Sequence, residues 1–566
     1  MEELFGLSMD YIMAGLLAVF LPVIAVVAFM AWRNPVMLKL GLRNIPRRKS
    51  QTALIVVGIM MSTLIMAAAF GTGDSITYSI RKNAIDALGT IDEIIVSARA
   101  SDSGTIGSFN YFPVQRYQQL KTELAGIESI DGLAPGIGEF APTVNTRTSL
   151  SEGRMQITGV DPSSLEGFGL FHLQDGQVVR LENLGPNDAL INEEAARELD
   201  AVIGDELVSF VAGSSVTFRV QGVVDSGGLA GQGSTLLVRL DRAQEIFGRE
   251  GQINSMAVSN LGGAFGGADF SEEVTDLLRV LFTDRIIAKQ LLSVLNREEI
   301  REQLALLSPS LDEKMAADLD TLAQGLEGGE LTDDFIGVLA DEAIQEEVLN
   351  AVNSAGLADV ERQASTLFAG LAEFRVLNIK KQVLDEADRA GSGVTSIFII
   401  MGLFSIMVGV LLIFLIFVML AAARRSEMGM ARAVGAKRRD LVQMFIFEGT
   451  AYSLVSGAVG VVVGLGASTI IVFMVNRIFQ SGGSGAPENF TMFAHFEPRS
   501  AIVAYCLGMV ITLGTVGFSA YRVSRMNIVA AIRDLPEHLG AQEEAGFLRR
   551  LLGIGLAIIH PAIFGF

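Results

Sequence analysis

Half of the 566 residues are hydrophobic, which makes the chain too apolar for an ordinary soluble enzyme. Charged residues make up 19%, too many for a chain that lies in a membrane throughout, so the composition predicts a few membrane spans and one or more soluble domains. The single cysteine, Cys506, lies in an apolar run and excludes an internal disulfide framework or a cysteine-rich metal site.

The net charge of −20 is unevenly distributed along the chain. The block from Thr72 to Gly393 holds 51 acidic and 24 basic residues, a net charge of −27, whereas the remaining residues carry +7. A block this acidic would repel phosphates, which argues against nucleic acid as a partner.

Five apolar runs are long enough to cross about 30 Å of hydrocarbon, which takes roughly 20 helical residues. None of them contains a charged residue, each of which would cost about 2.5–3.5 kcal/mol at the bilayer centre. A buried helix of a soluble protein would seldom stay apolar on every face for so long. The sequence therefore predicts five transmembrane helices: Tyr11–Trp32, Thr52–Gly73, Val394–Ala423, Gly449–Val475 and Ala501–Ala520.

Lysine and arginine gather in three connecting segments, which five alternating spans place on one side of the membrane: Arg33–Lys49, Arg424–Arg439 and Arg522–Arg533. Positive charge marks this side as cytoplasmic. The acidic block, the short loop near Ser481–Pro487 and the N-terminus are then outside.

Two patterns divide the acidic block. From Ile91 to about Ser259, short β-branched runs such as Met155–Val160 are broken by Gly, Pro and Asp, which predicts a compact α+β domain. From Phe270 to about Gly370 the sequence is acidic, rich in Leu and Ala, and periodic at helical spacing, so we expect a helical insertion.

A helical stripe follows the insertion. It consists of Val376, Ile379, Val383 and Ala387 and leads directly towards the third span. The stripe predicts a stalk helix, which either carries motion between the membrane and the outer domain or simply packs there.

The second cytoplasmic segment contains the most specific motif in the chain. It has the pattern E-x-G-x-x-R-A-x-G-A, formed by Glu427, Gly429, Arg432, Ala433, Gly435 and Ala436, and Glu448 stands at the start of the next helix. This pattern resembles that of FtsX-like permeases. The segment Leu40–Lys49, leading into Val57-Gly58-Ile59, resembles the amphipathic helix and first core span of the same family. The turns Gly159–Pro162 and Gly204–Leu207 resemble those of a MacB-like periplasmic core domain.

The resemblance covers roughly Val36–Asp534, with the helical insertion as the main unmatched part. The chain departs from the family at Asn527, where a proline is typical, and in its extra first span. It also stops within a new apolar run whose residues Leu552–Ala557 are similar to Leu38–Arg43. We therefore expect either the first half of a longer permease or a subunit that forms a dimer.

The expected fold class is a membrane α-helical protein, with a four-helix FtsX-like core, one extra N-terminal span and a large extracytoplasmic α+β domain that carries a helical insertion. The expected segments are an extra span (1–33), a cytoplasmic amphipathic helix (34–51), a span (52–73), the MacB-like α+β domain (74–270), the insertion (271–370), the stalk helix (371–393), a span (394–423), a cytoplasmic coupling segment (424–444), a span (445–476), an outer loop (477–498), a span (499–521), a cytoplasmic segment (522–550) and the start of a further apolar segment (551–566).

Glycines predict close helix packing in the fourth span. Gly457, Gly460 and Gly464 include a G-x-x-x-G spacing, which lets helix backbones approach closely. This face suits either a subunit interface or packing within one subunit.

The resemblance implies the permease subunit of an ABC transporter in a prokaryotic inner membrane. A partner ATPase would bind the coupling segment and move the outer domain, in order to export or extract a lipid, lipoprotein, peptide or drug. Expected partners are this ATPase, a second permease half or homodimer partner, the bilayer and an envelope protein at the outer domain. The alternatives are an FtsX-like regulator of a peptidoglycan hydrolase and a transmembrane sensor.

No catalytic residue, cofactor or metal site is expected. The sequence has no G-x-x-x-x-G-K-[ST] phosphate loop and no H-E-x-x-H motif, and its four histidines lack ligand spacing. The spans also lack the charges that ion-coupled transport requires, so energy is expected to come from another subunit.

Overall fold

The computed structural model describes residues 3–4, 7–44, 49–98, 110–173, 176–211, 213–311, 313–393, 435–480 and 491–524, with a few positions between 396 and 419. The chain divides into two compact units, one formed by Met1–Tyr78 with Ala390–Phe566 and the other by Ser79–Arg389. Each unit is described by itself.

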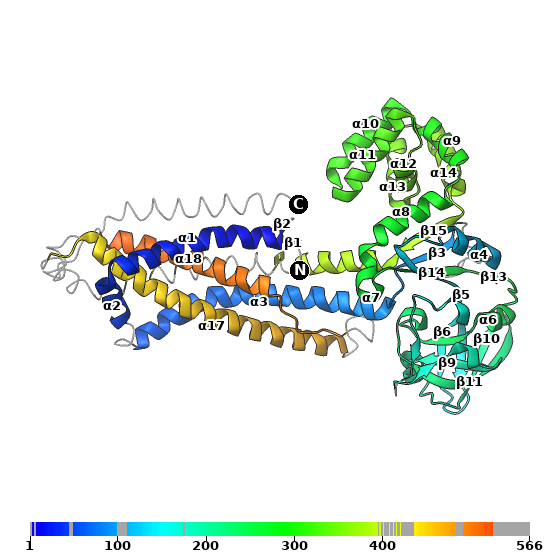
Figure 1. The fold of residues 1–566 in the computed structure, drawn as a ribbon, viewed down its shortest axis with the longest axis horizontal. Helices are drawn as coiled ribbons and strands as arrows, with labels where there is room; N and C mark the ends of the chain where they lie inside the picture. The colour runs from blue at the N-terminus through cyan, green and yellow to red at the C-terminus, as the bar shows by residue number, and fades with distance from the viewer. Residues whose placement is uncertain are drawn as a thin grey trace. The chain divides into compact units, whose positions relative to one another are not determined.

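Long apolar helices form the described part of the first unit (Figure 1). A small hairpin of β1 (Glu3–Leu4) and β2 (Leu7–Ser8) precedes them, and the helices are α1 (Met9–Arg33), α2 (Pro35–Asn44), α3 (Lys49–Leu88), α17 (Arg438–Gln480) and α18 (Pro498–Ser524). All but α2 are long and apolar enough to cross a membrane. Four of the five predicted spans are thus seen as helices, and the fifth, Val394–Ala423, lies almost entirely outside the described residues.

Helix α3 is longer than the predicted span within it. Its 40 residues extend over about 60 Å, roughly twice the hydrocarbon thickness. The helix continues past the domain boundary expected at residue 74 and ends at Leu88. Gly71, near the expected end, is needed for close packing instead, since a Cβ there would lie 3.1 Å from Ser468 Oγ.

A partly closed sheet forms the base of the second unit. Its nine strands have the order β10-β11-β9-β12-β6-β5-β14-β3-β15, and β10 also pairs with β5. Six strands, from β5 round to β10, therefore close into a ring, and β14, β3 and β15 extend the sheet from the first half of β5. The strands are β3 (Glu93–Ser97), β5 (Ile130–Asn145), β6 (Ser151–Val160), β9 (Asp188–Asn192), β10 (Glu206–Val211), β11 (Ser214–Val224), β12 (Thr235–Arg239), β14 (Ser255–Asn260) and β15 (Phe374–Asn378).

Short elements complete this domain. Two further pairs of strands are β4 (Phe112–Pro113) with β13 (Gln252–Ile253) and β7 (Phe171–His172) with β8 (Val178–Val179). The helices are α4 (Val114–Glu123), α5 (Glu193–Glu198), α6 (Leu240–Phe247) and α7 (Gly263–Gly266), and the 3-10 turns are η2 (Pro162–Ser164), η3 (Leu181–Asn183), η4 (Gly228–Ala230) and η5 (Gly267–Asp269).

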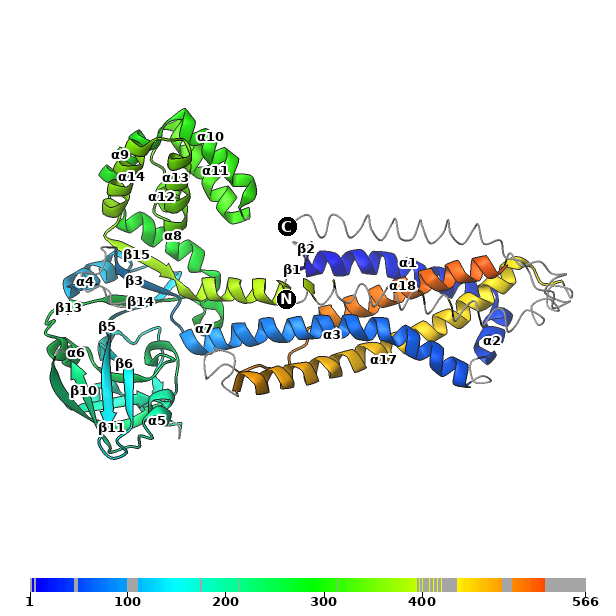
Figure 2. The same cartoon turned by 180° about the vertical axis from the view of Figure 1, so that it is seen from behind.

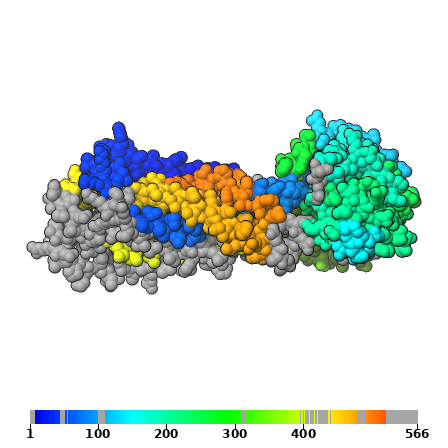
Figure 3. Space-filling model, turned by 90° about the horizontal axis from the view of Figure 1, so that it is seen from below, coloured from blue at the N-terminus to red at the C-terminus, as the bar shows by residue number. Residues whose placement is uncertain are grey.

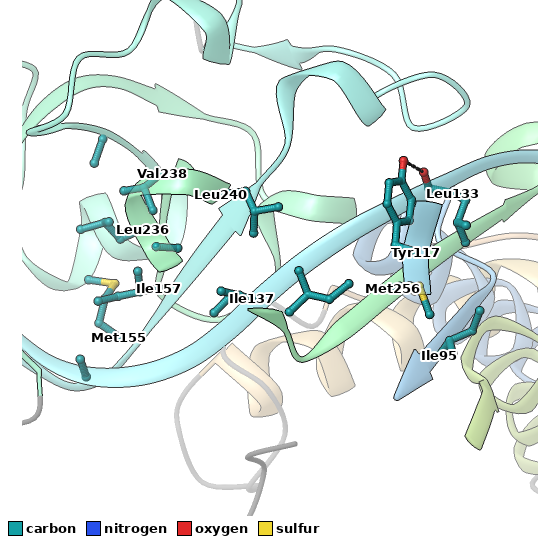
Figure 4. Close-up of a cluster of buried hydrophobic side chains, with 14 of the residues drawn as sticks. Ile95, Tyr117, Leu133, Ile137, Met155, Ile157, Leu236, Val238, Leu240 and Met256 are labelled. Carbon is teal, nitrogen blue, oxygen red and sulfur yellow. Dashed lines mark hydrogen bonds between the residues drawn. The ribbon is translucent and has the colours of Figure 1, made fainter. Parts of the chain in front are cut away.

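Alternating apolar side chains fill the interior of the ring. Met155 and Ile157 on β6 and Leu236 and Val238 on β12 are each fully buried, as the two-residue period of a strand requires (Figure 4). Tyr117 on α4 lies in another part of the same cluster, near Leu133 and Met256, and its hydroxyl donates to the carbonyl oxygen of Leu133 at 3.2 Å (Figure 4).

The helical insertion has a hydrophobic core of its own. Its helices are α8 (Ser271–Phe282), α9 (Arg285–Leu295), α10 (Glu298–Leu307), α11 (Glu313–Gly328), α12 (Asp333–Leu339), α13 (Glu342–Ser354) and α14 (Ala358–Leu371), with the 3-10 turn η6 (Ser308–Ser310). Figures 1 and 2 show α9–α14 gathered side by side next to α8. Leu322, Phe335 and Val348 are buried in their core, and Asp284, Thr332 and Asp341 cap α9, α12 and α13.

The expected stalk helix 371–393 begins later than predicted. Residues Phe374–Asn378 form strand β15, which pairs with β3, and the helix covers 379–393. Its buried positions are Lys380, Leu384, Ala387 and Gly391. Of the predicted stripe, Ala387 is fully buried, and Val376 and Val383 are partly buried against hydrophobic clusters. The pattern did not reveal that the buried residue of the first turn is a lysine. We call residues 379–393 the stalk helix.

These elements confirm the predicted fold class: apolar membrane helices together with a large α+β domain that carries a helical insertion.

Candidate functional site

The expected coupling motif lies partly outside the described residues. Glu427, Gly429, Arg432 and Ala433 fall there, whereas Gly435 and Ala436 stand just before α17. Gly435 is exposed and has φ = +109°, which only glycine adopts without strain, so it makes the turn into the helix. The carboxylate of Asp440 accepts a hydrogen bond from the backbone N–H of Lys437 at 2.9 Å and so caps the first turn of α17.

Helix α2 packs directly on the start of α17. The Asn34 side chain donates to Gln443 Oε1 at 2.8 Å, and a Cβ on Gly41 would lie 3.0 Å from the carbonyl oxygen of Met444. Glu448, the last residue of the predicted coupling set, is fully buried and accepts a hydrogen bond from the Tyr452 hydroxyl at 3.0 Å. The segment next to the coupling motif is therefore firmly joined to α2.

The three glycines predicted to pack helices face neighbours in the same chain. A Cβ on Gly457 would lie 3.1 Å from the ring of Tyr505 on α18, and one on Gly460 would lie 2.9 Å from the carbonyl oxygen of Met60 on α3. A Cβ on Gly464 would lie 2.5 Å from the carbonyl oxygen of Leu64. Helices α3 and α18 thus occupy the glycine face of α17. The part of α17 that remains at the surface is seen in yellow to orange in Figure 3.

At the far end of the bundle, polar side chains join α3 to the start of α18. The Ser500 hydroxyl donates to the Asp74 carboxylate at 3.0 Å, and the backbone N–H of His495 donates to Ser75 Oγ at 3.2 Å. The rings of Tyr78 and His495 stack with centroids 4.0 Å apart. Helix α3 is therefore held to α17 between Thr52 and Thr72 and to the start of α18 at Asp74 and Ser75.

The outer part of α3 is fixed in the second unit. Arg81 forms an ion pair with Asp388 of the stalk helix at 2.7 Å. Beyond it, Gly227 in the turn before η4 lies against the carbonyl oxygen of Asp86, with φ = +117° and no room for a Cβ. The end of α3 thus contacts both the stalk helix and the ring of strands.

A buried ion pair lies where the stalk helix begins. Lys380 Nζ is 2.6 Å from Asp92 Oδ1, both side chains are completely buried, and the backbone N–H of Asn260 donates to the other Asp92 oxygen at 2.8 Å. Burial raises the pKa of the Asp92 carboxyl above its usual value, while the hydrogen bonds from Lys380 and Asn260 oppose the rise. A Cβ on Gly267 would strike this carboxylate, so the position admits only glycine.

Glu93 extends the buried cluster. Its side chain is fully buried and accepts a hydrogen bond from the amide of Asn260 at 3.0 Å. Burial raises the pKa of Glu93 to about 7, because the charged form loses its hydration, although the side chains of Ser271 and Asn260 partly offset this. The cluster joins β3, β14, the stalk helix and, through Ser271, the start of the insertion.

Sequence reasoning missed this cluster. Asp92 and Glu93 stand at the start of the apolar strand β3, where acids are ordinarily exposed. Lys380 is followed by the half-exposed Lys381, so nothing in the sequence marks it as buried. The one available signal was the position of Lys380, in register with Leu384, Ala387 and Gly391 at helical spacing. Among the residues that the structure describes, no group of three or more His, Cys, Asp or Glu side chains could hold a metal ion.

Two protein families match the chain. A MacB-like periplasmic core domain matches residues 52–264, and an FtsX-like permease C-terminal region matches residues 399–528. Both were expected from the motifs. The insertion, α8–α14, lies between the two matches.

Individual relatives are similar over shorter stretches. The macrolide export ATP-binding/permease protein MacB of Syntrophobacter fumaroxidans is 28% identical over 141 residues, which are 25% of this chain and 17% of that protein. The ABC transporter permease YtrF of Bacillus subtilis is 24% identical over 139 residues, 24% of this chain and 31% of that protein. The chain thus matches less than a third of the length of each. The crystal structure of the periplasmic region of MacB from Actinobacillus actinomycetemcomitans is 14% identical, with a TM-score of 0.24 and coverage of 34% of this chain and 85% of that one.

Proposed function

We propose a function from the premise that this chain is a multi-pass inner-membrane protein of the FtsX-like, MacB-like permease family. It is the permease subunit of an ABC transporter in which a partner ATPase moves the extracytoplasmic domain. The movement serves export or extraction of a lipid, lipoprotein, peptide or drug.

The unbroken helix α3 carries this proposal. It runs as one element from Lys49 to Leu88, and at successive levels it contacts α17, α18, the stalk helix and the ring of strands. A helix with continuous backbone hydrogen bonds transmits a displacement with little loss, whereas a loop would absorb it. A push on the start of α17 would pass to α3 through Gly460 and Gly464, where backbones are in direct contact.

The proposed contact with the ATPase is the segment Glu427–Ala436, followed by Glu448. Gly435 makes the turn into α17, so a rigid displacement of the segment acts on that helix directly. A second permease half or a second copy of the chain completes the transporter.

The first test is co-purification from native membranes followed by an ATPase assay. The chain should bring an ATPase with it, and a Glu427→Lys/Gly435→Trp double variant should release it. Gly466→Ala serves as the control, because a Cβ there meets nothing within 4 Å. If the unaltered chain binds no ATPase, the proposal is wrong and the sensor interpretation takes its place.

A cross-link tests transmission itself. A Cβ at position 391 would lie 2.9 Å from Thr77 Cβ, so the two positions face one another at less than the 3.5–4.5 Å that a disulfide spans, and a small shift of the helices would admit the bond. In a Cys506→Ser background, Thr77→Cys/Gly391→Cys should join α3 to the stalk helix under oxidation. We expect ATPase binding to persist while substrate-stimulated ATPase activity falls, and reduction to restore it. Unchanged stimulation in the oxidised protein would refute transmission along these helices.

The insertion favours a second candidate function, regulation of a peptidoglycan hydrolase. It has its own core and lies outside both family matches, which suits a docking domain for another protein. A hydrolase that co-purifies through the insertion, with no substrate-stimulated ATPase activity, would favour this alternative.

A further inference from the structure

Strand β15 ends the sheet and leaves one of its edges open. The backbone N–H of Ala98 donates to the carbonyl oxygen of Glu373 at 3.1 Å, and that of Ile379 donates to Asp92 at 3.2 Å. Since antiparallel strands alternate, the odd-numbered residues of β15 bond to β3. The N–H and C=O groups of Phe374, Val376 and Asn378 therefore point away from the sheet, and no other strand of the described residues pairs with them.

A groove follows this edge. It has a volume of about 540 Å³ and lies between β15, the start of α13 and the end of α14. Four consecutive residues, Phe374–Leu377, line it. Because successive side chains of a strand point to opposite faces, a groove lined by all four runs along the edge rather than over one face.

The same edge is already used just before β15, where the regular alternation has not yet begun. The carbonyl oxygen of Glu373 faces β3, but its backbone N–H faces the other edge and donates to the carbonyl oxygen of Phe282 at 3.2 Å, and Thr283 pairs with Ala372 as an antiparallel bridge. The edge therefore accepts an antiparallel partner there, and the groove begins where this pairing stops.

Charge defines what the groove would accept. Its two cations are already paired, Arg279 with Asp341 at 2.8 Å and Arg375 with Glu342, which leaves the exposed Glu346. The surrounding insertion, Ser271–Leu371, holds 21 acidic and 7 basic residues, a net charge of −14. An incoming strand is attracted if it is basic and repelled if it is acidic.

We propose that β15 binds an extended, basic peptide segment of a partner protein on the outer side of the membrane, added to the sheet as a further strand. Main-chain hydrogen bonds to Phe374 and Val376, which both line the groove, hold the segment, and its basic side chains face α13 and α14. This docking does not depend on whether the chain transports a substrate.

The test measures binding of a fluorescent Lys-Val-Lys-Val-Lys-Val-Lys peptide to the purified full-length chain in detergent by anisotropy. Two matched peptides separate the causes: one with its valine amides N-methylated, which keeps the charge but blocks one edge, and one with Glu in place of Lys. We expect each to bind at least tenfold more weakly. Equal binding of the N-methylated peptide would show plain electrostatic attraction and overturn the proposal.

Variants of the chain give an independent result. Val376→Pro removes an outward N–H without touching the bonds to β3, and edge strands tolerate proline, so peptide binding should fall at least tenfold. Glu346→Lys should weaken binding several-fold, whereas Glu330→Lys, an equal change of charge outside the groove, should not. Full binding by a folded Val376→Pro variant would refute the proposal; should that variant fail to fold, the N-methylated peptide decides.

Discussion

Two neighbouring lysines at the start of the stalk helix should differ sharply in what they contribute to stability. Lys380 is completely buried against Asp92, whereas Lys381 is half-exposed and pairs with Asp385 one turn along the same helix at 2.9 Å. Lys380→Met leaves a buried carboxylate without its cation. Lys381→Met removes only an exposed ion pair.

The expected magnitudes follow from these environments. Removing one partner of a buried pair costs about 3–5 kcal/mol, while an exposed pair in a helix contributes about 0.3–0.5 kcal/mol. Since about 1.4 kcal/mol is a tenfold change in an equilibrium, local opening should increase roughly a hundred- to several-thousand-fold for Lys380→Met, and about twofold for Lys381→Met. Hydrogen–deuterium exchange of peptides from β3 and β15, followed by mass spectrometry on the full chain in detergent, measures this opening.

The pH dependence of the Lys380→Met variant supplies a second check. Without the lysine, the Asp92 carboxyl keeps a raised pKa in the folded state, so the folded protein holds a proton that the unfolded protein has lost. The stability of the variant then falls as the pH rises from about 4 through the folded pKa of Asp92. Exchange relative to the intrinsic rate at each pH should therefore slow when the pH is lowered. Adding Asp92→Asn should restore protection at neutral pH. Equal exchange in the Lys380→Met and Lys381→Met proteins would refute the role of the buried pair.

Three further changes test other contacts. Glu93→Gln should stabilise the outer domain at pH 8 by on the order of 3 kcal/mol and flatten the pH dependence of its stability between about 4.5 and 7. The reason is that a carboxyl with a folded pKa of about 7 costs stability as the pH rises through this range. Pulse proteolysis at several pH values measures the stability. Gly464→Ala should destabilise the bundle by about 1–3 kcal/mol, whereas Gly466→Ala should not, because a Cβ at position 466 has no neighbour within 4 Å. Thermal unfolding in detergent compares the two variants, and equal melting temperatures would contradict the packing argument. Arg81→Glu should raise exchange at the end of α3 by about two- to fivefold, and Arg81→Glu/Asp388→Arg should reverse this; no recovery in the double variant would show that the ion pair contributes nothing.

The membrane helices could be predicted from sequence because their signal is local. A long apolar run without charge specifies a span wherever its neighbours lie, and α1, α3, α17 and α18 follow the predicted runs. The insertion is similar, since helical periodicity and caps such as Asp284 and Thr332 lie within each helix. The E-x-G-x-x-R-A-x-G-A motif indicated the family for the same reason.

The rest depends on contacts between distant residues. The ring closes only because β5 pairs with β10, some 60 residues later, and no local pattern encodes that pairing. Strand β15 is only five residues long and enters the sheet beside β3, almost 300 residues earlier. The burial of Lys380 could not be predicted, because it depends on Asp92, which the sequence does not bring near.

Strand β15 is placed so that docking and transmission would affect one another. Its last residue, Asn378, is followed at once by Ile379, whose N–H bonds to Asp92, and by Lys380, which pairs with the same carboxylate. A strand bound at the open edge would therefore stiffen the start of the stalk helix. If the proposed ATPase moves that helix, binding at the two sites is coupled. The bound peptide then changes the affinity of the ATPase for a non-hydrolysable ATP analogue by some factor, and the bound analogue must change the affinity of the β15 edge for the peptide by the same factor. Equal factors that differ from one would join the two proposals, and a factor of one in both directions would make the β15 edge a docking surface alone.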